Sequence, residues 1–268
     1  MREILFKGKI STEKLKLAQL TRMRKKLSEL IEQRDFLNYH EGQRLHAQYM
    51  LKIGRLEFQA YELYIEQLRL KRKSELIQVY LNQQKKIEIQ QIEQRLKKEL
   101  KTYQEKLSQM FSDIEKAKSE EKKTELSEED SLSIKKLYRD LIKKLHPDLN
   151  PNLSEQEKLY YQQAVEAYEQ ADLETIRTLT LLVTESLENK TLVDFESQKV
   201  NLEQLIKKLE EEITEIKSDF PFTEIDLLES QEAITKRREE LFEIIKDYRK
   251  EVKNWQEKIK HQMEDGNG

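Results

Sequence analysis

Glycine and proline are so scarce in this chain that long uninterrupted helices are its most accessible regular structure. The 268 residues include 5 Gly and 3 Pro, whereas average soluble domains use both several times more often. Charged residues make up 38% and aromatic residues 7% of the sequence, a composition poor in strand-forming side chains. We therefore predict an all-α protein. Because only 37% of the residues are hydrophobic, the apolar side chains should form narrow stripes between helices.

Composition also argues against several classes of function. The chain has no Cys, which excludes disulfides and thiolate metal sites and makes the cytoplasm our expected location. A formal net charge of -3 gives no general reason to expect nucleic-acid or membrane-surface binding. Charged residues interrupt the apolar ones in residues 1–10, so we predict neither a signal peptide nor a membrane span, which needs roughly 18 apolar residues. We expect no metal and no cofactor.

Heptad-like spacing predicts long helical arms on both sides of a central segment. A first helix should end near Leu37, followed by a tight connection around Asn38 to Gly42 and a second helix from about Gln43 towards Lys118. Two further helices, separated near Pro221, should form a C-terminal hairpin. The clearest a/d stripe consists of Leu96, Leu100, Tyr103, Leu107, Met110, Ile114 and Ala117.

These patterns divide the chain into four parts. We assign a helical coiled-coil arm to 1–118, a charged linker to 119–132, a small helical module to 133–184 and a helical hairpin to 196–264. The predicted fold is a set of long antiparallel coiled-coil helices that flank a short helical hairpin. Heptads support packing within one chain and between chains alike, so a homo-oligomer stays possible at this point.

The central segment combines an apolar stripe with a row of cations. Ile134 to Leu145 should form one amphipathic helix, with its apolar residues at spacings of three and four. Cationic residues occupy the opposite side of this helix at the same spacings, and His146 stands at the next position of that series. The series consists of Lys136, Arg139 and Lys143, and Lys135 and Lys144 widen it.

A proline should end this helix abruptly. Pro147 lacks the backbone N–H that a helix needs, and its ring disfavours helical geometry at His146. We therefore expect a corner that presents the His146 imidazole and the Asp148 carboxylate outward. Ser154 and Glu157 form a capping-box pattern that should begin the next helix. Its buried stripe should comprise Tyr161, Ala164, Val165 and Tyr168.

At these residues the chain resembles the J-domain, or DnaJ-like, co-chaperone family. Tyr138 to Asp148 is similar to the second helix and signature loop of J domains, and Glu166 to Glu169 is similar to the end of their third helix. The resemblance covers residues 133–173, and the whole chain resembles bacterial J-domain-containing proteins with long helical flanks. It implies a protein without enzymatic activity of its own, which binds a DnaK-class chaperone and stimulates its ATPase. The implied partner-binding residues are His146, Pro147, Asp148, Lys136, Arg139, Lys143 and Lys144.

Several positions depart from the family pattern. Asp140 stands where a second basic residue is usual, and Leu149 stands where Lys or Arg commonly follows the tripeptide. The motif of the family's first helix is missing before Leu132, so its packing role should fall to Glu125 to Leu132, to Leu173 to Val183, or to the coiled coil. The family's glycine-phenylalanine linker, zinc module and β-rich substrate domain are also missing from the sequence.

Two other classes of function compete with this interpretation. The chain could be a coiled-coil scaffold in which the J-like hairpin is degenerate and only structural. It could also be a nucleic-acid-associated helical protein, although its net charge disfavours this. The cations that would serve the latter are Lys14, Lys16, Arg22, Arg24, Lys25 and Lys26. The client protein or complex that the helical arms would recognise is not encoded in any motif we identify.

Overall fold

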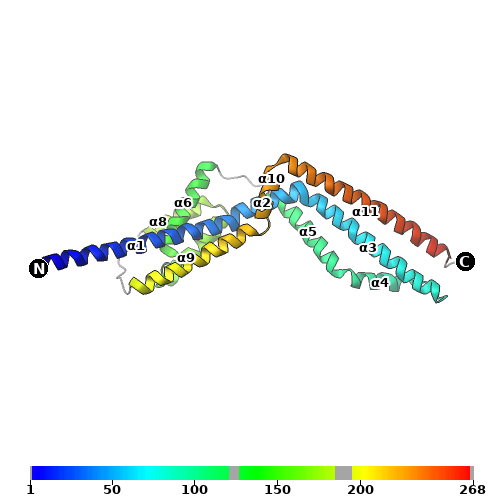
Figure 1. Cartoon of the computed structure of the whole chain (residues 1–268), viewed down its shortest axis with the longest axis horizontal. Helices are drawn as coiled ribbons and strands as arrows, with labels where there is room; N and C mark the ends of the chain where they lie inside the picture. Colours follow the sequence, from blue (N-terminus) through cyan, green and yellow to red (C-terminus); the bar gives the residue numbers. More distant parts are fainter. Residues whose placement is uncertain (1, 121–126, 185–194, 266–268) are drawn as a thin grey trace. The chain divides into compact units, whose positions relative to one another are not determined.

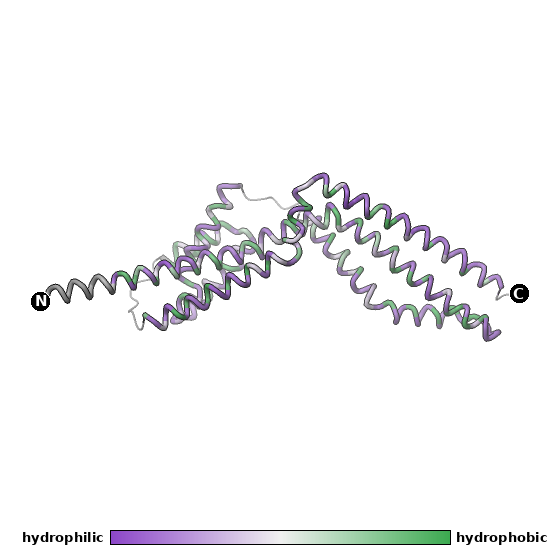
Figure 2. Tube along the Cα trace, viewed as in Figure 1, coloured by the Kyte–Doolittle hydropathy of each residue, from purple (hydrophilic) through white to green (hydrophobic). Residues whose placement is uncertain are grey.

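The computed structural model describes residues 2–120, 127–184 and 195–265. Within these ranges every regular element is a helix, which confirms the all-α prediction (Figure 1). Hydrophobic positions are interspersed with hydrophilic ones along each long helix, as narrow stripes require (Figure 2). The chain divides into two compact units, one formed by Met1–Gln43 with Thr124–Thr223 and the other by Arg44–Lys123 with Glu224–Gly268.

The first unit contains α1 and the central helices. Its elements are α1 (Arg2–Phe36), a π-helical turn η1 (Leu37–Glu41), α6 (Glu128–Leu145), α7 (Glu155–Glu169), α8 (Leu173–Thr184) and α9 (Phe195–Ser218). The second unit contains η2 (Met50–Gly54), α3 (Arg55–Asn82), α4 (Ile89–Glu99), α5 (Lys101–Glu120), α10 (Ile225–Glu229) and α11 (Gln231–Asp265). The short helices α2 (Gly42–Tyr49) and η3 (Phe222–Glu224) begin in the first unit and end in the second.

The tight connection expected at Asn38 to Gly42 is wrong, because the backbone there stays helical. Two π-helical turns, η1 and η2, interrupt the α-helical hydrogen-bond pattern without reversing the chain. Gly42 keeps helical dihedral angles (φ -62°, ψ -42°) and donates its N–H to the carbonyl of Leu37. A Cβ atom at this position would lie 2.7 Å from the Leu37 oxygen, so the widened turn requires glycine.

The second helix does not continue to Lys118, as the heptad pattern suggested. It ends at Asn82, and Gln84 adopts a left-handed conformation (φ 52°) that turns the chain back. Ile92 and Leu96 of α4 then pack against Leu76 and Ile77 of α3. The predicted a/d stripe is consequently divided between α4 and α5, which separate at Leu100. A helical pattern continues through such a reversal because both sides of the hairpin are amphipathic.

The antiparallel arrangement predicted for the long arms is also wrong for two of the pairs. Helix α1 runs parallel to α9, since Arg24 contacts Gln198 and Lys26 contacts Glu210 further along both helices. Helix α3 runs parallel to α11, where Arg237 binds Glu57 and the buried Gln262 binds Ser74. The C-terminal hairpin is therefore replaced by separate pairings of α9 and α11. Short loops favour antiparallel neighbours, but these partners are too distant in sequence for any loop to constrain them.

The predicted linker at 119–132 extends too far. Residues 121–126 lie outside the described part of the chain, but Glu128 onward belongs to α6. The Ser127 side chain caps α6 by accepting a hydrogen bond from the N–H of Asp130 (3.1 Å). Acidic residues in the first turn also interact favourably with the helix dipole. The charged composition that predicts a linker is thus, in part, a helix N-terminus.

Among the described residues, nineteen buried side chains form the hydrophobic core of the first unit. α1 contributes Leu20, Leu27 and Ile31 to it, and the remaining members come from α6, α7, α8, α9 and the α6–α7 loop. In the described part of the chain, we find no helix whose length and apolar character would suit a bilayer.

Candidate partner interface

The predicted corner forms at the expected residue. α6 ends at Leu145, and His146 takes extended dihedral angles (φ -67°, ψ 129°) immediately before Pro147. The N–H groups of Leu149 and Asn150 donate to the His146 carbonyl at 3.0 and 2.9 Å. This compact loop has a fixed backbone because its turn hydrogen bonds are satisfied locally.

A side-chain amide and a capping box fix the rest of the loop. The Asn150 side chain donates to the carbonyl of Lys143 at 3.0 Å, which ties the loop to the end of α6. The capping box of Ser154 and Glu157 is present and begins α7, as the sequence predicted. Together these contacts hold α6 and α7 as two short helices joined by a defined loop.

The imidazole of His146 is not presented to solvent, which corrects our expectation. The residue is 8% exposed, and its ring meets the Tyr161 ring edge to face with 5.2 Å between centroids. Its Nδ1 atom accepts a hydrogen bond from the backbone N–H of Asp148 at 3.2 Å. Burial lowers the pKa of His146, and the nearby Asp148 carboxylate partly opposes that change. The imidazole therefore shapes the loop as a neutral acceptor, while Pro147 and Asp148 are exposed.

The cationic row of α6 splits into two groups. Lys136 and Lys143 are exposed, and Lys143 binds the Asp140 carboxylate of its own helix at 2.9 Å. Arg139 instead binds Glu32 of α1 at 3.0 Å. The outlying cations are partly buried: Lys135 places its ammonium 3.4 Å from the centroid of the Phe36 ring, and Lys144 is also partly buried.

Two carboxylates of α1 attach that helix to both helices of the hairpin. Asp35, 2% exposed, accepts a hydrogen bond from the Tyr138 hydroxyl at 2.7 Å. Glu32, 7% exposed, accepts one from the Tyr168 hydroxyl at 3.3 Å besides binding Arg139. The rings of Tyr138 and Tyr168 stack with 3.9 Å between centroids. Burial is the largest cause that raises the pKa of both tyrosines, so both hydroxyls stay protonated donors.

Sequence reasoning did not identify this buried polar cluster of Glu32, Asp35, Tyr138, Arg139 and Tyr168. A signal was present, because the cluster's two acids and the buried Ser28 recur at spacings of four and three. This series runs beside the apolar stripe of α1. A polar series at helical spacing beside a core stripe indicates buried hydrogen bonding or a second contact surface.

Two further elements pack against the hairpin of α6 and α7. α8 packs against both α6 and α7, while α1 packs antiparallel against α6. Asp172 caps α8 by accepting hydrogen bonds from the N–H and hydroxyl of Thr175 at 3.0 and 2.6 Å. Of the three segments considered for this packing, Leu173 to Val183 and the first long helical arm therefore both contact the hairpin.

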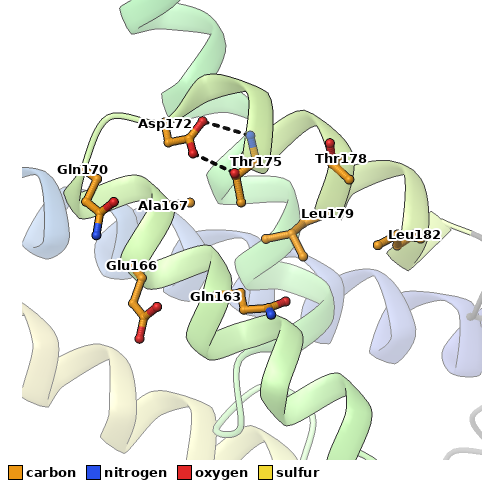
Figure 3. Close-up of a pocket in the computed structure, with 9 residues that line it drawn as sticks. All are labelled: Gln163, Glu166, Ala167, Gln170, Asp172, Thr175, Thr178, Leu179 and Leu182. Atoms are coloured by element: carbon orange, nitrogen blue, oxygen red, sulfur yellow. Dashed lines mark hydrogen bonds between the residues drawn. The ribbon is translucent and has the colours of Figure 1, made fainter.

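A groove of about 350 Å³ lies between α7 and α8 (Figure 3). Gln163 and Glu166 line one side and Thr178 and Leu182 line the other, so the lining mixes amides, carboxylates, hydroxyls and apolar groups. Across the described ranges, no group of three or more His, Asp or Glu residues is placed to hold a metal ion.

The cations considered for nucleic-acid binding are partly engaged within the first unit. Lys26 binds Glu210 at 2.7 Å, and the ammonium of Lys16 lies 4.9 Å from the centroid of the Phe195 ring. Lys25 lies 3.8 Å from Glu29. Of these cations, Lys26 is the one whose described ion pair joins α1 to another helix, so its charge is compensated within the unit.

Comparisons of the chain with protein-family models, with curated proteins and with solved structures find no match.

Proposed function

We propose that this chain is a J-domain co-chaperone that docks on a DnaK-class chaperone in the cytoplasm and stimulates its ATP hydrolysis. The observation that carries the proposal is the loop after α6, where Pro147 and Asp148 are exposed and follow the exposed cations Lys136 and Lys143 of that helix. An exposed carboxylate in the loop, preceded by ammonium groups along α6, suits a partner surface that offers a cation for the carboxylate and acids for the ammonium groups. The second unit and the long helix α1 would bind the client or complex that receives the chaperone.

The three residues His146, Pro147 and Asp148 would have different roles in docking. Asp148 makes the outward contact, because its side chain is exposed. His146 acts through the loop, since its Nδ1 atom accepts the Asp148 N–H and its ring packs on Tyr161. Pro147 fixes the corner by ending α6. The imidazole is thus a positioning group, and its replacement should alter the geometry with which Asp148 is presented.

Single-turnover ATP hydrolysis by a bacterial DnaK-class chaperone tests the proposal. Wild-type protein should accelerate hydrolysis, and Asp148→Asn should remove most of that acceleration because it removes the outward charge. His146→Gln should also abolish the acceleration, since an amide cannot reproduce both the ring contact with Tyr161 and the acceptor geometry. Glu155→Gln provides a matched control, because Glu155 is an exposed acid at the start of α7 that pairs only with its helix neighbour Lys158 at 2.7 Å among the described contacts.

A second candidate is a helical scaffold whose J-like hairpin is only structural. The burial of His146 and the engagement of Arg139 with Glu32 favour this alternative, because both remove side chains from a possible interface. The two candidates differ in the Asp148→Asn variant. A scaffold would keep every activity unchanged, whereas a co-chaperone would lose its effect on the ATPase.

A further inference from the structure

One stretch of α1 carries six cations and no acid. Between Lys14 and Ser28 every charged residue is Lys or Arg, and all of these charged side chains are exposed. They are Lys14, Lys16, Arg22, Arg24, Lys25 and Lys26. The formal net charge of -3 for the whole chain therefore conceals a local excess of positive charge on α1.

Three of these cations receive little compensation from acids. In α11, by contrast, Lys246 binds Glu243 of the preceding turn at 2.9 Å. Within residues 2–120, 127–184 and 195–265, Lys14 and Arg22 make no ion pair, and Lys25 has one, at 3.8 Å from an exposed acid of the next turn. Because an exposed ion pair contributes little, all three charges stay available to a partner.

The same three cations lie on one side of α1. Successive residues of an α-helix are rotated by about 100°, so Lys14, Arg22 and Lys25 fall within a sector of about 80°. The core residues Leu20 and Leu27 lie on the opposite side of the helix, so this sector faces away from the core. At 1.5 Å per residue, Lys14 and Arg22 are about 12 Å apart along the helix axis. We call these three residues the cationic stripe.

The spacing of the cationic stripe suits two strands of phosphates. The major groove of a B-form duplex is about 12 Å wide, so α1 lying across the groove can place Lys14 against one strand and Arg22 against the other. A guanidinium also binds two phosphate oxygens at once. A lipid bilayer suits the segment less well. The exposed Leu15 and Leu17 point about 160° apart around the helix, so they form no single apolar face for insertion.

We propose that the cationic stripe of α1 binds the phosphate backbone of a nucleic-acid duplex without reading its base sequence. Contacts to phosphates position a protein on a duplex and carry no sequence information. Three phosphate contacts predict that the logarithm of the binding constant falls against the logarithm of the salt concentration with a slope of about -2.7. The stripe uses no residue of the loop after α6, so this inference does not depend on the proposed function.

Fluorescence anisotropy of a labelled DNA duplex tests the proposal with the full chain. Wild-type protein should bind at low salt, and it should bind a duplex of unrelated sequence within about twofold. Neutralising the stripe should weaken binding at least about tenfold and remove most of the salt dependence. This stripe variant combines Lys14→Gln, Arg22→Gln and Lys25→Gln, which are exposed positions, so circular dichroism should show unchanged helicity.

A matched control removes the same number of Lys and Arg charges from exposed positions of α11. It combines Lys246→Gln, Arg249→Gln and Lys253→Gln. The control should bind the duplex as wild-type protein does. Equal loss of binding in the two variants would overturn the proposal, because total charge and not the stripe would then be responsible. Failure of folded wild-type protein to bind the duplex at low salt would overturn it as well.

Competition separates phosphate strands from other anionic partners. Vesicles that contain phosphatidylserine, and polyglutamate, are added at the same concentration of negative charge as unlabelled duplex. We expect the unlabelled duplex to displace the labelled one at a concentration at least about tenfold lower than either competitor needs. Displacement by vesicles or by polyglutamate at the same concentration as by duplex would assign the stripe to a membrane or to an acidic protein and would contradict the proposal.

Discussion

The hydrogen bond from Tyr138 to Asp35 should contribute measurably to the stability of the first unit. Tyr138 is fully buried, its hydroxyl lies 2.7 Å from a carboxylate oxygen of Asp35, and Asp35 is 2% exposed. Hydrogen bonds to charged groups contribute about 1.5–3 kcal/mol. Asp35 keeps a second donor in Arg34 at 2.6 Å, so its charge is not left wholly uncompensated. We therefore expect Tyr138→Phe to lower the free energy of unfolding by about 2 kcal/mol.

Thermal and urea unfolding measure this change, with Tyr160→Phe as the matched control. Tyr160 is a partly buried tyrosine of the same core, and its hydroxyl makes no hydrogen bond that we find in the described residues. Loss of the Tyr160 hydroxyl should lower the free energy of unfolding by less than about 0.5 kcal/mol. For a domain of the size of the first unit, a loss of about 2 kcal/mol in the free energy of unfolding corresponds to a fall of about 8 °C in Tm. Equal stability of the two variants would refute the view that α1 is attached to the hairpin through this cluster.

Three further predictions concern pH, capping and the second unit. Burial lowers the pKa of His146, so the unfolded chain binds a proton at a higher pH than the folded chain does, and stability should fall as pH drops below about 6.5. Burial also lowers the pKa of His40, so His146→Gln should reduce this fall in pH-dependent melting without removing it, and an unchanged pH dependence would contradict the reasoning. Ser154→Ala should destabilise the first unit by about 1 kcal/mol in urea titration, because the capping box loses its hydroxyl; no change would mean that the α7 terminus frays already. Gln262→Leu should cost about 1–3 kcal/mol because the Ser74 hydroxyl donates to Gln262 inside the α3 and α11 pair, and a stabilised variant in calorimetry would contradict this.

Local chemistry made the loop predictable from sequence. Pro147 excludes a continuing helix, and the pair Ser154 and Glu157 begins the next one, whatever the rest of the chain does. Both features appear where the sequence placed them. Helix boundaries were less predictable. The turn after α3 depends on a left-handed backbone conformation at Gln84, which lies in a polar run without the Gly or Pro that usually indicates a turn.

Pairings between distant segments could not be derived from a single sequence. The apolar stripes of α9 and α11 do not by themselves select α1 and α3 as partners, since heptads specify a surface and not a partner. The exposure of individual site residues could not be predicted for the same reason. Arg139 and Lys136 belong to one cationic series, but only Arg139 meets α1, and His146 is buried because Tyr161 covers it.

The proposed function requires that the loop containing Asp148 acts on a chaperone ATPase. A titration of this protein against a DnaK-class chaperone preloaded with ATP, read as the rate of a single turnover, tests that claim directly. We predict a saturable acceleration that Asp148→Asn eliminates while leaving helicity and Tm unchanged. A rate equal to that of the chaperone alone at every concentration of the wild-type protein would contradict it.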